Sequence, residues 1–267
     1  MKKLSFLSRT LESDLVKDGL CAISAIDNCP QSKGLISVAG GMAVQSYLPE
    51  EYRRATGDID LLVSRPLNYE EFKQFSNPVS EYLQDNKYQV DTLKMEGAYG
   101  LLIGNNNDRL LIEFSRRNKQ NFEKNRKLIE RELLNSRRKK VEGREKDYST
   151  LSPEDIALPK LVRSINALKR RPGLGGIVLQ YQSPVICGAS EVLLERINSL
   201  REETFFNIGN LELAEKLRFM SDLYDIRVLS ELVGYNKNYM FEASKDWDTL
   251  REESPEKDKI LRILPDI

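Results

Sequence analysis

The chain contains no histidine among its 267 residues. This absence excludes Ser-His-Asp and Cys-His triads, histidine general bases and histidine metal ligands. The cysteines, Cys21, Cys29 and Cys187, are too few and too scattered for a disulfide framework or a zinc cluster. Any catalysis must therefore use carboxylates, Lys, Arg, Tyr, Ser or a metal held by oxygen ligands.

Long hydrophobic runs are also missing. No apolar run approaches the roughly 18 residues of a membrane span. The N-terminal stretch Met1–Leu7 has two lysines with no long apolar core after them, so it does not resemble a secretory signal. Hydrophobic residues are 40% and charged residues 31% of the chain, which is typical of a soluble protein. We expect a cytoplasmic protein without membrane contacts.

Charge of one sign is not in excess overall, since Lys+Arg and Asp+Glu number 41 each. The balance is uneven along the chain, because residues 116–146 hold 13 Lys/Arg against 5 Asp/Glu. Such a stretch could face a polyanion such as RNA. It could equally be a solvated helix with ion pairs between residues i and i+4.

The hydrophobic pattern of the first half predicts a mixture of helices and strands. Helices are expected over residues 10–28, from 41, over 69–85 and over 118–140. Strands are expected over 35–39, 59–63, 88–95, 99–103 and 110–114, with a hairpin turn at 105–108. This half is expected to form one α/β domain covering residues 1–148.

The pattern becomes mainly helical in the second half. Ser152 as N-cap, Pro153 at the first helical position and two acids after it predict a helix start. A segment rich in Gly and Pro interrupts the pattern at 172–189, and helical periodicity resumes at 191–200 and 211–233. The sequence thus predicts an α+β protein with a mixed-sheet domain and a helical domain over residues 149–267.

The most informative motif is Gly40-Gly41 followed by Asp58-Ile59-Asp60. The glycines separate an expected strand from an expected helix, where exposed backbone N–H groups suit phosphates. Asp58 and Asp60 begin the next expected strand and share one of its faces, because side chains alternate along a strand. Two carboxylates side by side suit Mg²⁺, and a nucleoside triphosphate (NTP) with its metal satisfies both features.

A third carboxylate strengthens this interpretation. Glu113 lies in the expected strand Leu110–Phe114, on the face opposite Ile112 and Phe114. It could project from the sheet beside the aspartate pair and complete a metal site. It could also be an ordinary outward-facing strand residue. If the three carboxylates converge, Asp58, Asp60 and Glu113 are the predicted metal ligands and catalytic residues.

Gly40-Gly41-x-Ala43 with Arg54-x-Thr56-x-Asp58-Ile59-Asp60 resembles the nucleotidyltransferase superfamily with the DNA-polymerase-beta-like fold. Within it, the Arg-x-Thr-x-Asp-Ile-Asp form is most similar to the AbiEii/AbiGii group, the toxins of type IV toxin–antitoxin systems. Leu151–Leu161 resembles that group's helix leading to a lysine, here Lys160, and Ser221–Ile226 resembles its later Asp-x-x-Asp helix. The resemblance spans roughly residues 35–230, although the superfamily usually has Asp where Glu113 stands.

This resemblance implies further site residues. Gly40, Gly41, Arg54 and Thr56 would contact the nucleotide, and Lys160 would be catalytic, neutralising leaving-group charge. Arg163 lies three residues after Lys160 on the same helix face and could join it on the β- and γ-phosphates. Asp222 could orient Lys160 or contact the nucleotide. The alternatives are a solvated basic face for the two cations and helix-surface acids for Asp222 and Asp225.

The predicted function is metal-dependent transfer of a nucleoside monophosphate from an NTP to an acceptor hydroxyl, with one or two Mg²⁺ as cofactor. The resemblance favours a macromolecular acceptor, and the basic stretch favours RNA such as tRNA over protein. If the chain is toxin-like, a small antitoxin should be its partner. The alternatives are transfer to a small antibiotic-type molecule, and a catalytically degenerate binding module in which the three carboxylates do not converge.

Overall fold

The computed structural model describes residues 9–27, 34–105, 108–115, 119–184, 189–207 and 209–264. The chain divides into two compact units. Unit 1 comprises the residues up to Ser46 together with Arg54–Ser152, and unit 2 comprises Tyr47–Arg53 together with Pro153 onwards. The N-terminal stretch 1–8, Cys29, Cys187 and the hairpin turn residues Asn106 and Asn107 lie outside the described residues.

Unit 1 is built on a seven-stranded sheet in the order β3-β4-β5-β2-β1-β7-β6. The pairs β2/β5 and β1/β7 are parallel and the other neighbours antiparallel, so the sheet is mixed. Its strands are β1 (Ile36–Ala39), β2 (Asp58–Val63), β3 (Gln89–Lys94), β4 (Ala98–Asn105), β5 (Asp108–Ser115), β6 (Arg137–Lys140) and β7 (Asp147–Thr150). The expected α+β class is confirmed.

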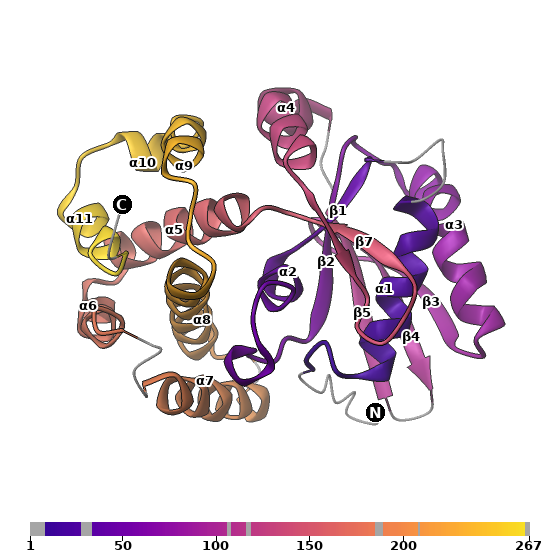
Figure 1. Cartoon of the computed structure of the whole chain (residues 1–267), viewed down its shortest axis with the longest axis horizontal. Helices are drawn as coiled ribbons and strands as arrows, with labels where there is room; N and C mark the ends of the chain where they lie inside the picture. Colours follow the sequence, from indigo (N-terminus) through magenta and orange to yellow (C-terminus); the bar gives the residue numbers. More distant parts are fainter. Residues whose placement is uncertain are drawn as a thin grey trace. The chain divides into compact units, whose positions relative to one another are not determined.

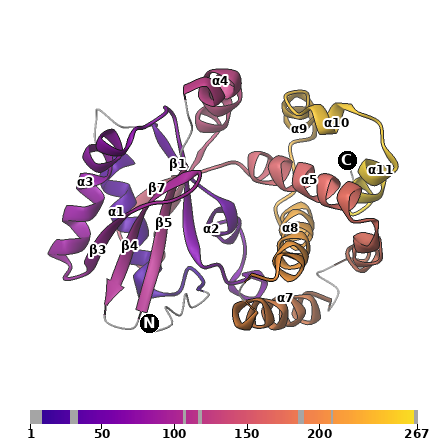
Figure 2. The same cartoon turned by 180° about the vertical axis from the view of Figure 1, so that it is seen from behind.

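Two helices, α1 (Asp14–Asp27) and α3 (Tyr69–Asp85), cover one face of this sheet (Figures 1 and 2). A Cβ added to Gly19 of α1 would touch Ile59 of β2 and Leu110 of β5, so these two side chains point toward α1. The short helix α2 (Gly40–Gln45) follows β1 directly and packs beside β2. Alternation along β2 therefore turns Asp58 and Asp60 away from α1.

Local sequence signals account for where several helices begin. Asn68 caps α3, and its side chain accepts a hydrogen bond from the Glu71 N–H at 2.9 Å while Glu71 accepts one from the Asn68 N–H at 2.8 Å. This reciprocal arrangement is a capping box, which satisfies two backbone donors at the helix start. Asn210 caps a long helix of unit 2 with its side chain alone, which accepts hydrogen bonds from the N–H groups of Glu212 and Leu213.

One expectation for unit 1 is wrong. The helix expected over residues 118–140 ends early, because α4 spans Lys119–Leu134 and Arg137–Lys140 form β6. The Ser136 hydroxyl donates to the Glu132 carbonyl at 3.1 Å and to Ser37 Oγ at 2.9 Å, which ends the helix and attaches the chain to the sheet. β6 is an edge strand with four charged side chains, a composition that opposes pairing of the edge with another chain. Because all four residues are charged, the sequence shows no alternation of apolar and polar residues there.

Unit 2 is helical among its described residues. The helix α5 (Pro153–Arg170) packs against α8 (Leu211–Leu232), α9 (Lys237–Ser244), α10 (Asp248–Arg251) and α11 (Pro255–Leu261), and α7 (Ala189–Phe206) packs against α8. The Gly- and Pro-rich segment after α5 forms the short helices η2 (Pro172–Leu174), α6 (Gly175–Val178) and η3 (Leu179–Tyr181), and η1 (Glu50–Tyr52) joins this unit. In the described ranges no helix has the length and hydropathy of a membrane span.

Candidate functional site

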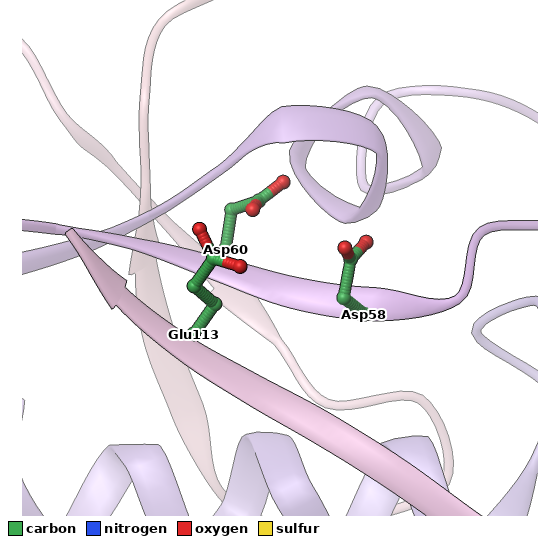
Figure 3. Close-up of side chains that lie close together, drawn as sticks. All are labelled: Asp58, Asp60 and Glu113. Carbon is green, nitrogen blue, oxygen red and sulfur yellow. The ribbon is translucent and has the colours of Figure 1, made fainter. Parts of the chain in front are cut away.

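Three carboxylates converge on the face of the unit 1 sheet that points away from α1. Asp58 and Asp60 project from β2, and Glu113 projects from β5, where it is the register partner of Asp60 in the parallel pair. Figure 3 shows all three side chains on the same side of these two strands. One oxygen from each carboxylate lies within 4.8 Å of an oxygen from each of the others, and all three residues are half-buried.

Crowding of like charge marks the electrostatics of this trio. Burial and, secondarily, the Asp58 carboxylate raise the pKa of Glu113 above its ordinary value. The Thr56 hydroxyl donates a hydrogen bond to Asp58 Oδ1 at 3.0 Å. Carboxylate oxygens gathered at this spacing are the donor set that Mg²⁺ prefers, and a bound divalent cation would relieve their mutual repulsion. The residues present thus fit the expected metal.

The diglycine lies directly against these acids. Gly40 has a φ of +63°, in the left-handed region, and a Cβ added there would overlap Asp60 Oδ2. A Cβ on Gly41 would lie 3.0 Å from Thr56 Oγ1 and 3.2 Å from an Arg54 guanidinium nitrogen. Glycine is therefore required at Gly40 for both backbone conformation and close approach. Of the predicted residues, Gly40 lies against Asp60 and Thr56 bonds to Asp58, while Gly41 lies beside Thr56 and Arg54.

A buried glutamine connects the end of α2 to the segments around Leu11 and Arg54. Gln45, at the end of α2, donates to the Arg54 carbonyl at 3.0 Å and accepts from the Leu11 N–H at 2.9 Å. Arg9 and Thr56 exchange two backbone hydrogen bonds at 2.7 and 2.8 Å. The sequence interpretation missed Gln45, for which the one available signal is an amide within an otherwise apolar short helix.

The remaining predicted residues form a second cluster, within unit 2. The Lys160 ammonium on α5 lies 3.1 Å from Asp222 Oδ1 and 2.9 Å from Asp225 Oδ2, both on α8. The side chains of Lys160 and Asp222 are 4% exposed and that of Asp225 is 0% exposed. Neither a solvated basic face for Lys160 nor surface acids describe this arrangement, which is a buried ion-pair network.

Arg163 extends the network toward solvent. Its guanidinium donates to both carboxylate oxygens of Asp222, each at 2.9 Å, and its side chain is 47% exposed. Two tyrosines add hydrogen bonds nearby in the chain: Tyr239 donates to the Asp155 carboxylate at 2.7 Å, and Tyr235 donates to the Ile226 carbonyl at 2.7 Å. Burial raises the pKa of Tyr235 well above its usual range, so this phenol stays protonated.

Gly40→Ala is expected to destabilise unit 1 and to displace Asp60. A non-glycine residue in the left-handed region costs about 1–2 kcal/mol, and the overlap with Asp60 adds to this. Urea unfolding followed by circular dichroism measures the loss. Gly57→Ala is the matched control, since no atom lies within 4 Å of a Cβ at Gly57. Equal stability of the two variants would contradict the packing of Gly40 against Asp60.

Glu113→Gln is expected to stabilise the metal-free protein relative to the parent at neutral pH. Because the folded-state pKa of Glu113 lies above its unfolded value, stability from this group is complete below the ordinary glutamate value of 4.5 and is lost as pH rises through the folded pKa. The difference in melting temperature between variant and parent should therefore vanish below pH 4.5 and grow above it. A constant difference across this range, measured without divalent cations, would contradict the raised pKa of Glu113.

Comparisons with known proteins do not assign a family or an activity to the chain. No family model matches the chain, and no curated protein matches it. Among solved structures, the chain is similar to an antigenic nucleotidyltransferase-like protein from Paracoccidioides brasiliensis, with 14% identity and a TM-score of 0.42 over 96% of this chain and 94% of that chain. A likeness at this TM-score assigns neither a fold family nor an activity, so the site itself must carry the functional argument.

Proposed function

We propose that the protein is a metal-dependent nucleotidyltransferase. The observation that carries this proposal is the convergence of Asp58, Asp60 and Glu113 beside the diglycine turn. A degenerate binding module would not need three half-buried carboxylates so close together, with the pKa of Glu113 raised by burial and secondarily by Asp58. Repulsion between the three carboxylates destabilises the metal-free protein, and a bound cation would remove this repulsion.

In the proposed reaction, an acceptor hydroxyl attacks the α-phosphorus of an NTP in line. A new oxygen–phosphorus bond forms, the bond to the β-phosphate oxygen breaks, and pyrophosphate leaves. Mg²⁺ held by Asp58, Asp60 and Glu113 would supply charge neutralisation for the triphosphate and a lowered pKa for the acceptor hydroxyl. Thr56 keeps Asp58 oriented through its 3.0 Å hydrogen bond, and Gly40 sets the position of Asp60.

Phosphate contacts are proposed for residues of both clusters. Gly40 and Gly41 would meet the triphosphate through their N–H groups, and the Arg54 guanidinium adjoins Gly41. Thr56, also predicted to contact the phosphates, gives its N–H to the Arg9 carbonyl and its hydroxyl hydrogen to Asp58, so it would contact a phosphate only by giving up one of these bonds. Arg163 has exposed surface to offer a phosphate, whereas Lys160 is buried between two aspartates. Lys160 would act on the leaving pyrophosphate only by exchanging one of these ion-pair partners.

A macromolecular acceptor, RNA before protein, is proposed because the first unit contains the basic stretch 116–146. Placement in the AbiEii/AbiGii group, with a small antitoxin as partner, is proposed on the motif Arg54-x-Thr56-x-Asp58-Ile59-Asp60. Growth arrest on expression of the parent but not of an Asp58→Asn variant would support a toxin role.

The test is incubation of the protein with each α-³²P-labelled NTP, Mg²⁺ and either total RNA or a protein lysate. Label on RNA that requires Mg²⁺ and is lost with EDTA is the expected result. Label on protein or on a small molecule would show that RNA is not the acceptor, while nucleotidyl transfer would still be the reaction. No transfer from any NTP, together with no Mg²⁺-dependent thermal shift by NTP, would overturn the proposal.

A further inference from the structure

A stripe of five residues on α7 is fully on the surface of unit 2. It consists of Val192, Arg196, Ser199, Glu203 and Phe206, which follow one another at helical spacings of four, three, four and three residues. All five are exposed, with Val192 at 47% and Phe206 at 73%. We call this set the α7 stripe. The neighbouring side of the helix, with Leu193, Ile197 and Leu200, is buried against the rest of the unit.

Exposed apolar side chains concentrate around this helix. Of the six large apolar side chains that are exposed among the described residues, four belong to η3, α7 or the first residue of α8: Leu179, Val192, Phe206 and Leu211. These side chains are separated by polar residues, so their exposure permits an interaction surface, and the pattern of charges between them carries the argument. The α7 stripe is therefore a candidate interaction surface.

The order of residue types makes the α7 stripe complementary to itself. Read in either direction, it runs apolar, charged, Ser199, oppositely charged, apolar. Arg196 and Glu203 are seven residues apart, about 10 Å along the helix, too far to pair with each other. Neither forms an ion pair with any other described residue, although Arg196 donates to the Gln180 side chain at 2.9 Å.

We propose that the α7 stripe is a dimer interface, on which α7 of a second copy of this chain lies antiparallel. About a two-fold axis at Ser199, Arg196 of each copy faces Glu203 of the other, and Val192 faces Phe206 of the other. An isologous contact of this kind needs a surface that is complementary to itself, which few sequences offer by chance. The small Ser199 at the axis lets the two helices approach closely.

A hollow beside the stripe fits the same arrangement. It has a volume of about 450 Å³ and is lined by Arg196, Ser199 and Glu203 of the stripe, with Ile177, Leu200 and Met220 providing apolar wall. Gln180, which receives the Arg196 hydrogen bond, also lines it. Glu195 and Lys216 complete its lining, so the hollow is mixed in character, and Phe206 of the second copy would take its apolar contact from Val192.

The interface is independent of the proposed transfer activity, since it uses unit 2 residues that no step of the reaction employs. Its area is limited to one helix pair and the adjoining hollow, which is small for an obligate dimer. We therefore expect a reversible dimer with a dissociation constant of about 10 µM, visible as a concentration-dependent mass in sedimentation or light scattering.

The decisive experiment is a charge exchange in the full chain. Arg196→Glu brings two glutamates together at each end of the interface and is expected to weaken dimerisation at least about tenfold. The double variant Arg196→Glu with Glu203→Arg restores both pairs in reversed polarity and should dimerise like the parent. Lys237→Glu, an exposed charge reversal on α9, is the matched control and should leave dimerisation unchanged. The melting temperature of each variant verifies folding.

A cross-link tests the position of the axis. In a background with Cys29→Ser and Cys187→Ser, Ser199→Cys is expected to form an intermolecular disulfide under mild oxidant, while Asn198→Cys, one residue around the helix, should not. A parent that stays monomeric at all concentrations, a dimer indifferent to Arg196→Glu, or equal cross-linking by both cysteines would overturn the proposal.

Discussion

Asp60→Asn is expected to reduce nucleotidyl transfer by at least about 10³-fold while leaving the protein folded. The substitution keeps the shape of the side chain but removes one of three charges that would hold the cation, an effect worth several kcal/mol on the transition state. Folding should persist because Asp60 is half-buried and its loss of charge reduces repulsion with Glu113. Transfer of label from the preferred α-³²P NTP, at saturating Mg²⁺, measures the effect.

The control for this prediction is Asp91→Asn. Asp91 lies on β3 of the same sheet and is exposed, so the variant loses the same charge from a strand without touching the carboxylate trio. It should transfer label like the parent. Retained activity in Asp60→Asn would refute the metal role of this residue. Loss of activity in both variants would instead indicate that the net charge of the protein controls transfer, and would contradict a specific role for Asp60.

Lys160→Met is expected to destabilise unit 2 by about 3–5 kcal/mol, because removing one partner of a buried ion pair leaves uncompensated charge. Asp225 is completely buried and would lose its lysine, and only Arg163 would still pair with Asp222. Since whole domains are stable by only about 5–15 kcal/mol, a loss of this size should lower the melting temperature substantially. Thermal and urea unfolding both measure it.

Second variants separate the structural role of Lys160 from a role in nucleotide binding. Lys160→Met with Asp225→Leu also removes the buried acid that has lost its lysine, so much of the lost stability should return. Arg163→Met should cost less than Lys160→Met, because Asp222 keeps Lys160 and the Arg163 side chain is half-exposed. If the stabilised double variant binds NTP like the parent, Lys160 does not contact the nucleotide. If NTP binding stays weak, the proposed phosphate role of Lys160 is supported.

Much of the fold was predictable because hydrophobic periodicity is a local property. The expected helix over 69–85 coincides with α3, and the expected strands over 59–63 and 110–114 lie within β2 and β5. The prediction failed at β6 because Arg137–Lys140 are all charged and continue the composition of α4. Whether such a segment is helix or edge strand depends on its pairing with the next strand, β7, and the all-charged composition of β6 gives no alternation that would reveal this pairing.

The sequence also predicted the site components, and the reasons differ between residues. Asp58 and Asp60 share a face because they are two residues apart on one strand, which the sequence alone determines. Glu113 reaches them only because β5 pairs with β2 in the register that sets it opposite Asp60. No local pattern specifies that register. For the same reason Gln45 went unnoticed, since its partners near residues 9–11 and 54 are brought to it by the fold.

The sequence by itself determined the residue pattern behind the proposed chemistry: it has no histidine, an aspartate pair within one expected strand and a glycine pair where a helix is expected to begin. It also determined most helices and strands, since propensity and periodicity act over a few residues. Only the tertiary structure decided that Glu113 completes the trio and that Lys160 is buried between Asp222 and Asp225. Strand register and helix packing arise from contacts between distant segments, and their energies are not written in any short stretch of chain.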